Sequence, residues 1–272
     1  MKRTIQNGVV ESKLDLRSIS GYIESARRFS DGDRNGVVVL RERPDSATVR
    51  VQGHDQVSVV MKFWDRSGWR AIVRRATRTT PAWREWNALT RLKDFRVPIA
   101  RPLSRFSLSD RQGRFSDVLV IEDLGEVQTA QTFVKEALVA GRIVEADKIE
   151  TQVIAITVGM VAANVLDSDH SMINCLCIEN GKVFRVDLEV ARIVRSVGAS
   201  RNLQSQMIAR LLTSYIYTVQ PFLDRATAFS LRVAEKMDAP RSVLRSAKAI
   251  IDQKLEHQRI TVGVDSKLPV DW

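Results

Sequence analysis

Three short segments near the start of the chain are rich in apolar residues and are expected to form β-strands, and the second of them alternates apolar and polar positions. The segments are VVVLRE at 37–42, TVRVQ at 48–52 and VSVVMKF at 57–63, separated by the short connections RPDSA and GHDQ. Connections this short join antiparallel neighbours, so we expect a meander. A fourth strand is expected within GRFSDVLVIED at 113–123, and Gly125 follows it.

A helix is expected between the third and fourth strands, in the segment TPAWREWNALTRL. Thr80 is suited to cap its first turn, and Pro81 is suited to the first helical position. Pro98 and Pro102 in RVPIARPL then stop the helix, because proline lacks the N–H that a helix interior needs. This part of the chain therefore combines strands with a single helix.

After Gly125 the spacing of apolar residues changes to that of helices. Apolar helix faces are predicted at 132–138, 146–166, 203–216 and 243–255. Two short strands interrupt them, INCLCIE at 173–179 and KVFRVDLE at 182–189, and the dipeptide Asn180-Gly181 is typical of the turn in such a hairpin. The second part of the chain is therefore predicted to be mainly helical.

Composition supports a folded protein of the α+β class. Hydrophobic residues make up 44% and charged residues 27% of 272 residues. We predict an N-terminal antiparallel sheet lobe with a helix at 37–123 and a mainly helical C-terminal lobe at 124–272, with 1–36 as an N-terminal extension of unassigned role. The longest uncharged apolar stretch, at 153–166, is shorter than the roughly 20 residues of a spanning helix, so a soluble protein without a secretory signal is expected. Cys175 and Cys177 lie too close in sequence for a disulfide framework, which favours core positions in a reduced, cytoplasmic compartment.

The net charge of +10 is concentrated in one segment. Between positions 62 and 105 there are twelve basic residues, opposed only by Asp65, Glu85 and Asp94, together with four of the five tryptophans. The basic residues are Lys62, Arg66, Arg70, Arg74, Arg75, Arg78, Arg84, Arg91, Lys93, Arg96, Arg101 and Arg105. Such a segment attracts phosphorylated substrates, anionic lipid surfaces or nucleic acid.

Candidate chemistry lies on the predicted hairpin of the second part. Asn174 enters its first strand, Asp169 lies shortly before that strand, and Asp187 leaves its second strand. Strand ends around one turn converge, and carboxylate and carboxamide oxygens are ligands suited to Mg²⁺. The remaining aspartate would then face an acceptor hydroxyl.

The order of elements and these spacings resemble the protein-kinase-like superfamily. Its catalytic loop reads H-R-D-x-x-x-x-N and is followed by an Asp of a D-F-G motif. Here the loop is Asp167-Ser168-Asp169-His170-Ser171-Met172-Ile173-Asn174, and the D-F-G position is Asp187-Leu188-Glu189. The segments VPIARPL and NLQSQMIARLLTSY further resemble the bacterial lipopolysaccharide core kinases, which phosphorylate Kdo or heptose sugars. The resemblance implies a bilobal protein-kinase-like fold.

The resemblance also implies roles for individual residues. Lys62 corresponds to the lysine that contacts the nucleotide phosphates, and Glu85, the only acid between Asp65 and Asp94, is its implied partner. Glu122 to Leu124 would form the hinge that meets adenine through backbone groups. ATP and Mg²⁺ are the implied cofactors, with Asn174 and Asp187 as metal ligands and Asp169 as the catalytic residue.

The sequence departs from the family pattern at three places. Asp167 and Ser168 replace the His and Arg of the H-R-D motif, so control by a phosphorylated activation loop is not expected. Glu189 replaces the D-F-G glycine, and RPDSA contains no glycine to cradle phosphate. His170 is interpreted as an orienting or structural residue. These departures keep a degenerate kinase among the alternatives.

We therefore expect a kinase acting on a sugar hydroxyl of the lipopolysaccharide inner core, in the cytoplasm at the inner face of the inner membrane. Its expected partners are an anionic glycolipid acceptor and, peripherally, an anionic membrane surface; nucleic acid is not the expected partner. One alternative is a phosphotransferase for another small molecule or for a protein. The other is a non-catalytic pseudokinase whose basic patch binds an anionic partner.

Overall fold

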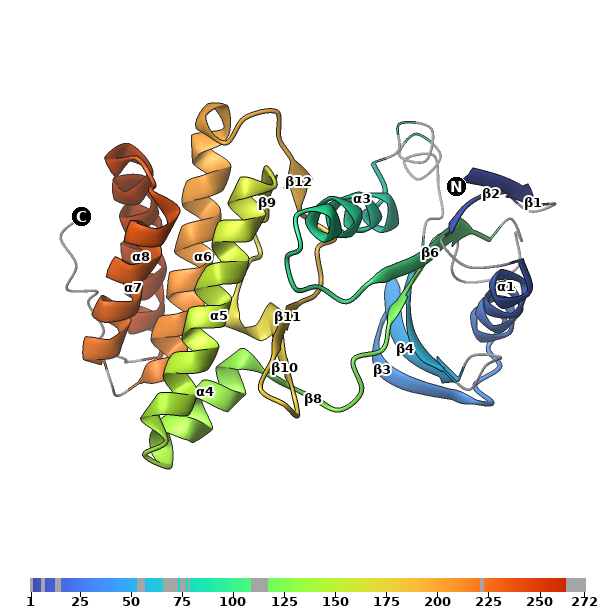
Figure 1. Ribbon diagram of the computed structural model, residues 1–272, viewed down its shortest axis with the longest axis horizontal. Helices are drawn as coiled ribbons and strands as arrows, with labels where there is room; N and C mark the ends of the chain where they lie inside the picture. The colour runs from blue at the N-terminus through green and yellow to red at the C-terminus, as the bar shows by residue number, and fades with distance from the viewer. Residues whose placement is uncertain are drawn as a thin grey trace. The chain divides into compact units, whose positions relative to one another are not determined.

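The computed structural model describes residues 2–5, 8–12, 16–52, 57–65, 73, 77, 79–108, 117–220 and 223–262. The chain divides into two compact units (Figure 1). Unit 1 is Met1–Thr90 with Ala100–Gly125, and unit 2 is Arg91–Ile99 with Glu126–Trp272. The first contains the large sheet, and the second contains the helical bundle.

Unit 1 is built on a seven-stranded antiparallel sheet with the order β1-β2-β6-β7-β5-β4-β3. Its strands are β1 Lys2–Ile5, β2 Gly8–Ser12, β3 Val37–Arg43, β4 Ser46–Gln52, β5 Ser58–Trp64, β6 Pro102–Ser107 and β7 Asp117–Glu122. The predicted meander is confirmed as β3, β4 and β5, and β7 confirms the fourth strand. The GHDQ connection and positions 113–116 lie outside the described residues.

Helix α1 (Leu16–Ser30) covers one face of this sheet, although no element was predicted in the first 36 residues. Ile19, Ala26 and Phe29 are buried in one cluster with Met61 and Phe63 of β5. The Phe29 and Phe63 ring centroids are 4.8 Å apart. Burial of large apolar side chains is the main stabilising term in folding, so α1 is a structural part of unit 1.

Helix α3 (Pro81–Asp94) begins as predicted. The Thr80 Oγ1 accepts a hydrogen bond of 3.3 Å from the Trp83 N–H, which confirms the cap. Side chains along β5 alternate between faces, so Lys62 lies on the face opposite Met61 and Phe63. α1 and α3 therefore contact side chains that leave β5 in opposite directions.

Unit 2 contains helices α4 (Ala130–Val139), α5 (Ile143–Ala162), α6 (Arg201–Val219), α7 (Leu223–Met237) and α8 (Arg241–Val262). α4, α5, α6 and α8 confirm the predicted helical spacing, and α7 was not predicted. Buried Glu150 of α5 accepts hydrogen bonds from Tyr215 of α6 and from Arg225 and Arg232 of α7, so one carboxylate joins three helices. Within the described residues, no helix combines the length and the apolar character needed to cross a membrane.

A small sheet completes unit 2 and carries the candidate chemistry. Strands β10 (Cys175–Ile178) and β11 (Val183–Arg185) form the predicted hairpin, and β8 (Val127–Thr129) pairs with β10 on its other side. β9 (Val165–Leu166) pairs with β12 (Arg192–Ile193), and single 3₁₀ turns span Met172–Asn174 and Gly198–Ser200. Cys175 and Cys177 are buried free thiols, as predicted. The loops flanking this hairpin hold Asp169, Asn174 and Asp187.

Candidate active site

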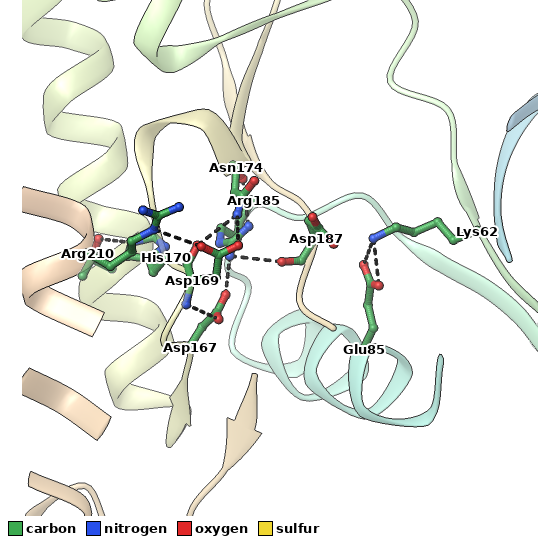
Figure 2. Close-up of polar contacts among 10 residues, drawn as sticks. Lys62, Glu85, Asp167, Asp169, His170, Asn174, Arg185, Asp187 and Arg210 are labelled. Atoms are coloured by element: carbon green, nitrogen blue, oxygen red, sulfur yellow. Dashed lines mark hydrogen bonds and ion pairs between the residues drawn. The ribbon is translucent and has the colours of Figure 1, made fainter. Parts of the chain in front are cut away.

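Lys62 and Glu85 form a buried ion pair within unit 1 (Figure 2). The Lys62 Nζ lies 2.8 and 2.9 Å from the two carboxylate oxygens of Glu85. The side chain of Glu85 is 1% exposed and that of Lys62 is 12% exposed. A buried carboxylate is strongly unfavourable without a cation, so the pair fixes the ammonium group in place. The structure thus brings together the two residues that the resemblance paired.

The predicted hinge residues Glu122 and Leu124 lie at the end of β7 and in the segment that follows it. Arginines engage both acidic side chains here: Arg101 Nε lies 3.0 Å from the Glu122 Oε2, and Arg50 Nε lies 2.7 Å from the Asp123 Oδ2. Among the described residues, the backbone N–H and C=O of Leu124 make no backbone hydrogen bond. The Glu122 N–H, in contrast, donates to the Arg101 carbonyl at 2.9 Å. The acidic side chains of this segment are held by arginines, and Leu124 is the predicted hinge residue without a backbone partner among those described.

The connection between β3 and β4 is a turn of only two residues, Pro44 and Asp45. Pro44 has no N–H to donate. The Asp45 carbonyl accepts a hydrogen bond of 2.8 Å from the Asp65 N–H. This turn supplies fewer backbone donors to a phosphate than a glycine-rich loop does.

Asp169 and Asn174 are held together inside the loop before β10. The Asn174 Nδ2 donates to the Asp169 backbone carbonyl at 2.9 Å and to its Oδ2 at 3.3 Å. These bonds turn the Asn174 amide nitrogen into the loop and leave its oxygen on the other side. The Asp169 Oδ1 accepts from Arg210 Nε of α6 at 3.0 Å. The Asp169 side chain remains 47% exposed and thus accessible to a substrate.

Asp187 lies just beyond β11, next to Asn174 in register. β10 pairs with β11 through Cys175 opposite Arg185, and the Val186 N–H donates to the Asn174 carbonyl at 3.0 Å. The hairpin therefore places Asn174 and Asp187 at the same end. Asp187 has a φ of 61°, a conformation that is uncommon for a residue with a side chain and often marks functional sites.

Arg185 organises both loops, and the sequence analysis missed it. Its guanidinium is fully buried and donates to the Asp167 Oδ2, to the Asn174 carbonyl at 2.9 Å and to the Asp187 carbonyl at 3.2 Å. The available signal was its position, because Arg185 has the same strand parity as buried Val183 in β11. A charged residue at an inward position of a strand indicates a buried polar partner.

Asp167 and His170 support the loop from inside. The Asp167 Oδ1 accepts from the Asp169 N–H at 2.9 Å. Burial raises the pKa of Asp167, and the adjacent Arg185 guanidinium opposes that rise. Burial, and secondarily Arg185, holds the pKa of His170 well below its ordinary value. The Thr157 hydroxyl donates to a backbone carbonyl, so neutral His170 donates from Nε2 to Thr157 and acts as a structural residue.

Comparison with known proteins decides the fold. No family model and no curated protein matches the chain. The structure of WaaP in complex with acyl carrier protein is similar, with a TM-score of 0.57 and 18% identity over 82% of this chain and 88% of that chain. The protein has a protein-kinase-like fold. The kinase domain of a Toxoplasma gondii specific rhoptry antigen is also similar, with a TM-score of 0.49 and 12% identity over 79% of this chain and 73% of that chain.

The oxygens offered by the kinase-like unit 2 fit a magnesium ion. Asn174 presents a carboxamide oxygen and Asp187 a half-buried carboxylate. Mg²⁺ keeps several waters and takes few protein ligands besides substrate phosphates, so two such residues suffice. No group of three or more His, Cys, Asp or Glu side chains suited to a metal occurs in the described part of the chain.

The basic segment at 62–105 is only partly described. Arg66, Arg70, Arg74, Arg75, Arg78 and Trp69 lie outside the described residues. Of the remaining members, Arg105 stacks on the Trp83 ring with 4.2 Å to the centroid, and Arg101 pairs with Glu122. These arginines are engaged within the kinase-like fold itself.

Proposed function

We propose that the protein is an ATP- and Mg²⁺-dependent phosphotransferase that phosphorylates a sugar hydroxyl of an anionic glycolipid, of the kind found in the lipopolysaccharide inner core (Kdo or heptose). The observation that carries the proposal is the arrangement of Asp169, Asn174 and Asp187 on one hairpin of a kinase-like fold. The buried pair of Lys62 and Glu85 supports it independently.

Each residue has a distinct part in this proposal. Lys62, fixed by Glu85, binds the nucleotide phosphates, and the backbone at Glu122 and Leu124 receives adenine. Asn174 and Asp187 hold Mg²⁺, which neutralises phosphate charge when bound. Asp169 orients the acceptor hydroxyl and receives its proton, since it is the exposed carboxylate of the loop.

The acceptor is expected to be anionic. The net charge is +10, and the chain resembles kinases of the lipopolysaccharide core in VPIARPL and NLQSQMIARLLTSY. A glycolipid acceptor would require work at the cytoplasmic membrane surface, where anionic lipids attract a basic protein. Turnover of a panel of neutral, phosphorylated and acidic sugars with labelled ATP distinguishes this acceptor class from proteins and other small molecules.

Calorimetric titration with Mg-ATP tests the nucleotide and metal assignments together. Asp187→Asn keeps a side chain that tolerates positive φ but removes the charge. We expect it to weaken Mg-dependent ATP affinity at least tenfold and to abolish turnover. Asp238→Asn is the matched control, because Asp238 is exposed and also has positive φ, 45°. Equal Mg-ATP affinity in wild type and Asp187→Asn would contradict the metal assignment.

A non-catalytic kinase-like module is the second candidate. The two-residue turn at Pro44 and Asp45 favours it, because few backbone donors remain there for phosphate. This candidate predicts no heat of binding and no thermal shift with Mg-ATP, together with retention of an anionic partner. Measurable Mg-ATP binding with turnover excludes it.

A further inference from the structure

Helix α6 presents Arg210 to the candidate catalytic residue. The Ser214 hydroxyl of the same helix accepts from the Met172 N–H at 3.0 Å, so this face of α6 packs against the loop. Arg210 lies one turn earlier, and its Nε donates to the Asp169 Oδ1 at 3.0 Å (Figure 2). The guanidinium is therefore anchored at a defined place beside the carboxylate.

Only part of the Arg210 donor set is used in this contact. A guanidinium carries five N–H donors in a planar fork, and the Nε accounts for one. Among the described residues, neither terminal nitrogen of Arg210 has a hydrogen-bond partner, and the side chain is 41% exposed. A guanidinium that is held through Nε and has both terminal nitrogens available can bind a carboxylate or a phosphate through two parallel hydrogen bonds.

α8 packs against α6, and Lys254 of α8 lies within electrostatic range of Arg210 and Asp169. It is half-buried and has no acidic partner within the part of the chain that the structure describes. Burial, and then the charge of Arg210, lowers the pKa of Lys254, while Asp169 opposes the shift; the three charges thus interact. Two cations against one carboxylate leave an excess of positive charge beside Asp169.

Stabilisation of the fold does not account for this arrangement. An ion pair between two side chains exposed to this extent contributes little to folding stability. Lys254, a second cation on the helix packed against α6, is within electrostatic range of Arg210, and like charges repel. A basic pair that faces solvent beside a reactive carboxylate is instead typical of a site that binds an anion.

We propose that Arg210 and Lys254 bind an anionic group of the acceptor, a carboxylate or a phosphate. This group lies close to the hydroxyl whose proton Asp169 receives. The inference rests on the proposed function and narrows its substrate class to sugars whose reacting hydroxyl lies near a negative group. Arg210 supplies the two-point contact and Lys254 the additional charge. A neutral sugar of the same size lacks both interactions.

NMR titrations with three probes test this site: glucose 1-phosphate, glucuronate and neutral glucose. Saturating Mg²⁺ and a non-hydrolysable ATP analogue are present, so that the nucleotide site is filled and does not take up the probes. The variants are Arg210→Gln and Lys254→Gln. Arg201→Gln and Arg245→Gln are matched controls, because each position is exposed and lies nine residues away, on the opposite face of α6 or α8.

We expect at least one anionic probe to bind at least tenfold more tightly than glucose. Arg210→Gln should remove that preference, Lys254→Gln should reduce it several-fold, and both controls should retain it. Preference for only one anionic probe identifies the group as phosphate or carboxylate. Equal binding of all three probes, absence of binding, or a preference unchanged in Arg210→Gln overturns the proposal. If the wild-type protein does not bind Mg-ATP, the proposed function is contradicted. The probe titrations are then carried out without nucleotide, and their outcome still decides whether this anion site exists.

Discussion

Asp167 and Asp169 are two residues apart and lie in opposite surroundings. Asp167 is fully buried and bound to Arg185, whereas Asp169 is nearly half exposed and bound to Arg210. The buried carboxylate is satisfied by its arginine within the structure, whereas the exposed carboxylate beside the Asn174 amide is accessible to a substrate. Asp167 supports the loop, because its carboxylate accepts from the Asp169 N–H and from Arg185.

Replacing each aspartate with asparagine separates the two roles. Asp169→Asn keeps the shape but removes the base, so kcat should fall by about 10² to 10⁴, the usual contribution of a positioned base, with ATP affinity nearly unchanged. Asp167→Asn should mainly lower the melting temperature, because Arg185 would lose its buried counter-charge. Measurement of kcat, ATP affinity and melting temperature for both variants checks this. A stable but inactive Asp167→Asn protein would reverse the assignment.

His170 gives the folded state a specific pH dependence. The pKa of His170 is well below 6.5 in the folded state and near 6.5 in the unfolded state. At pH values between these two pKa values, the unfolded state therefore binds more protons than the folded state. The contribution of His170 to stability is therefore fully present above pH 6.5 and is lost as the pH falls below it. His170→Gln retains a donor toward Thr157 and should remove this contribution. Urea unfolding at pH 7 and pH 5 measures it, and an identical decrease in the variant would contradict it.

At the scale of elements, Arg185 joins β11 to the two loops that carry the candidate site. The buried cation contacts Asp167, Asn174 and Asp187, so the positions of both loops depend on it. The loop that contains Asp167 lacks the arginine of the H-R-D motif. Arg185 of the neighbouring strand β11 holds this loop instead. The absence of control by a phosphorylated activation loop stays a prediction from the sequence.

A double-mutant cycle between Arg185 and Asp167 measures this connection. Arg185→Met leaves Asp167 buried without its cation and should cost about 3–5 kcal/mol of unfolding free energy. Adding Asp167→Asn should recover about 1–3 kcal/mol, as expected for residues in direct contact. The exposed pair of Arg142 and Glu145 is the matched control, with a coupling below about 1 kcal/mol. Additive effects at Arg185 and Asp167 would show that the pair is not coupled.

Elements were predictable from the sequence where one physical signal dominated. Apolar runs separated by short turn-like connections indicated β3, β4 and β5, with alternation in the TVRVQ segment of β4, and Thr80 with Pro81 marked the start of α3. β6 was missed because Pro102 begins it and polar Ser104 occupies one of its buried positions, which hides the alternation. In α1, Ile19, Tyr22, Ala26 and Phe29 do follow helical spacing, so this helix was readable although it was not predicted.

The candidate site was predictable only where it is local in sequence. Asp169 and Asn174 are five positions apart and hydrogen-bond within one loop, so their spacing carried the prediction. Arg210 lies 41 positions from Asp169, and only packing of α6 against the loop brings them together. Glu85 was assigned because few acids compete with it in its segment. Such an argument by exclusion is not available for Arg210 or Lys254.

At the scale of the whole molecule, a basic chain has the two units of a kinase-like fold, and each unit carries part of the candidate chemistry. Unit 1 holds the pair of Lys62 and Glu85, and unit 2 holds the loop and hairpin with Asp169 and Asp187. Each group is fixed by buried contacts of its own unit. Loss of one group should therefore leave the other unit folded.

The net charge of +10 leads to a final prediction about membrane surfaces. Vesicles containing about 30 mol% phosphatidylglycerol should bind the protein at 0.1 M NaCl, because each Lys or Arg near an anionic surface contributes about 1 kcal/mol. At 1 M NaCl the screening length shrinks from about 10 Å to about 3 Å, so the bound fraction should fall at least fivefold. Co-sedimentation measures this, with neutral phosphatidylcholine vesicles as the control. Equal capture by neutral vesicles, or binding indifferent to salt, would contradict an electrostatic membrane contact. Retention on duplex DNA with a steeper salt dependence than on vesicles would favour the nucleic-acid alternative instead.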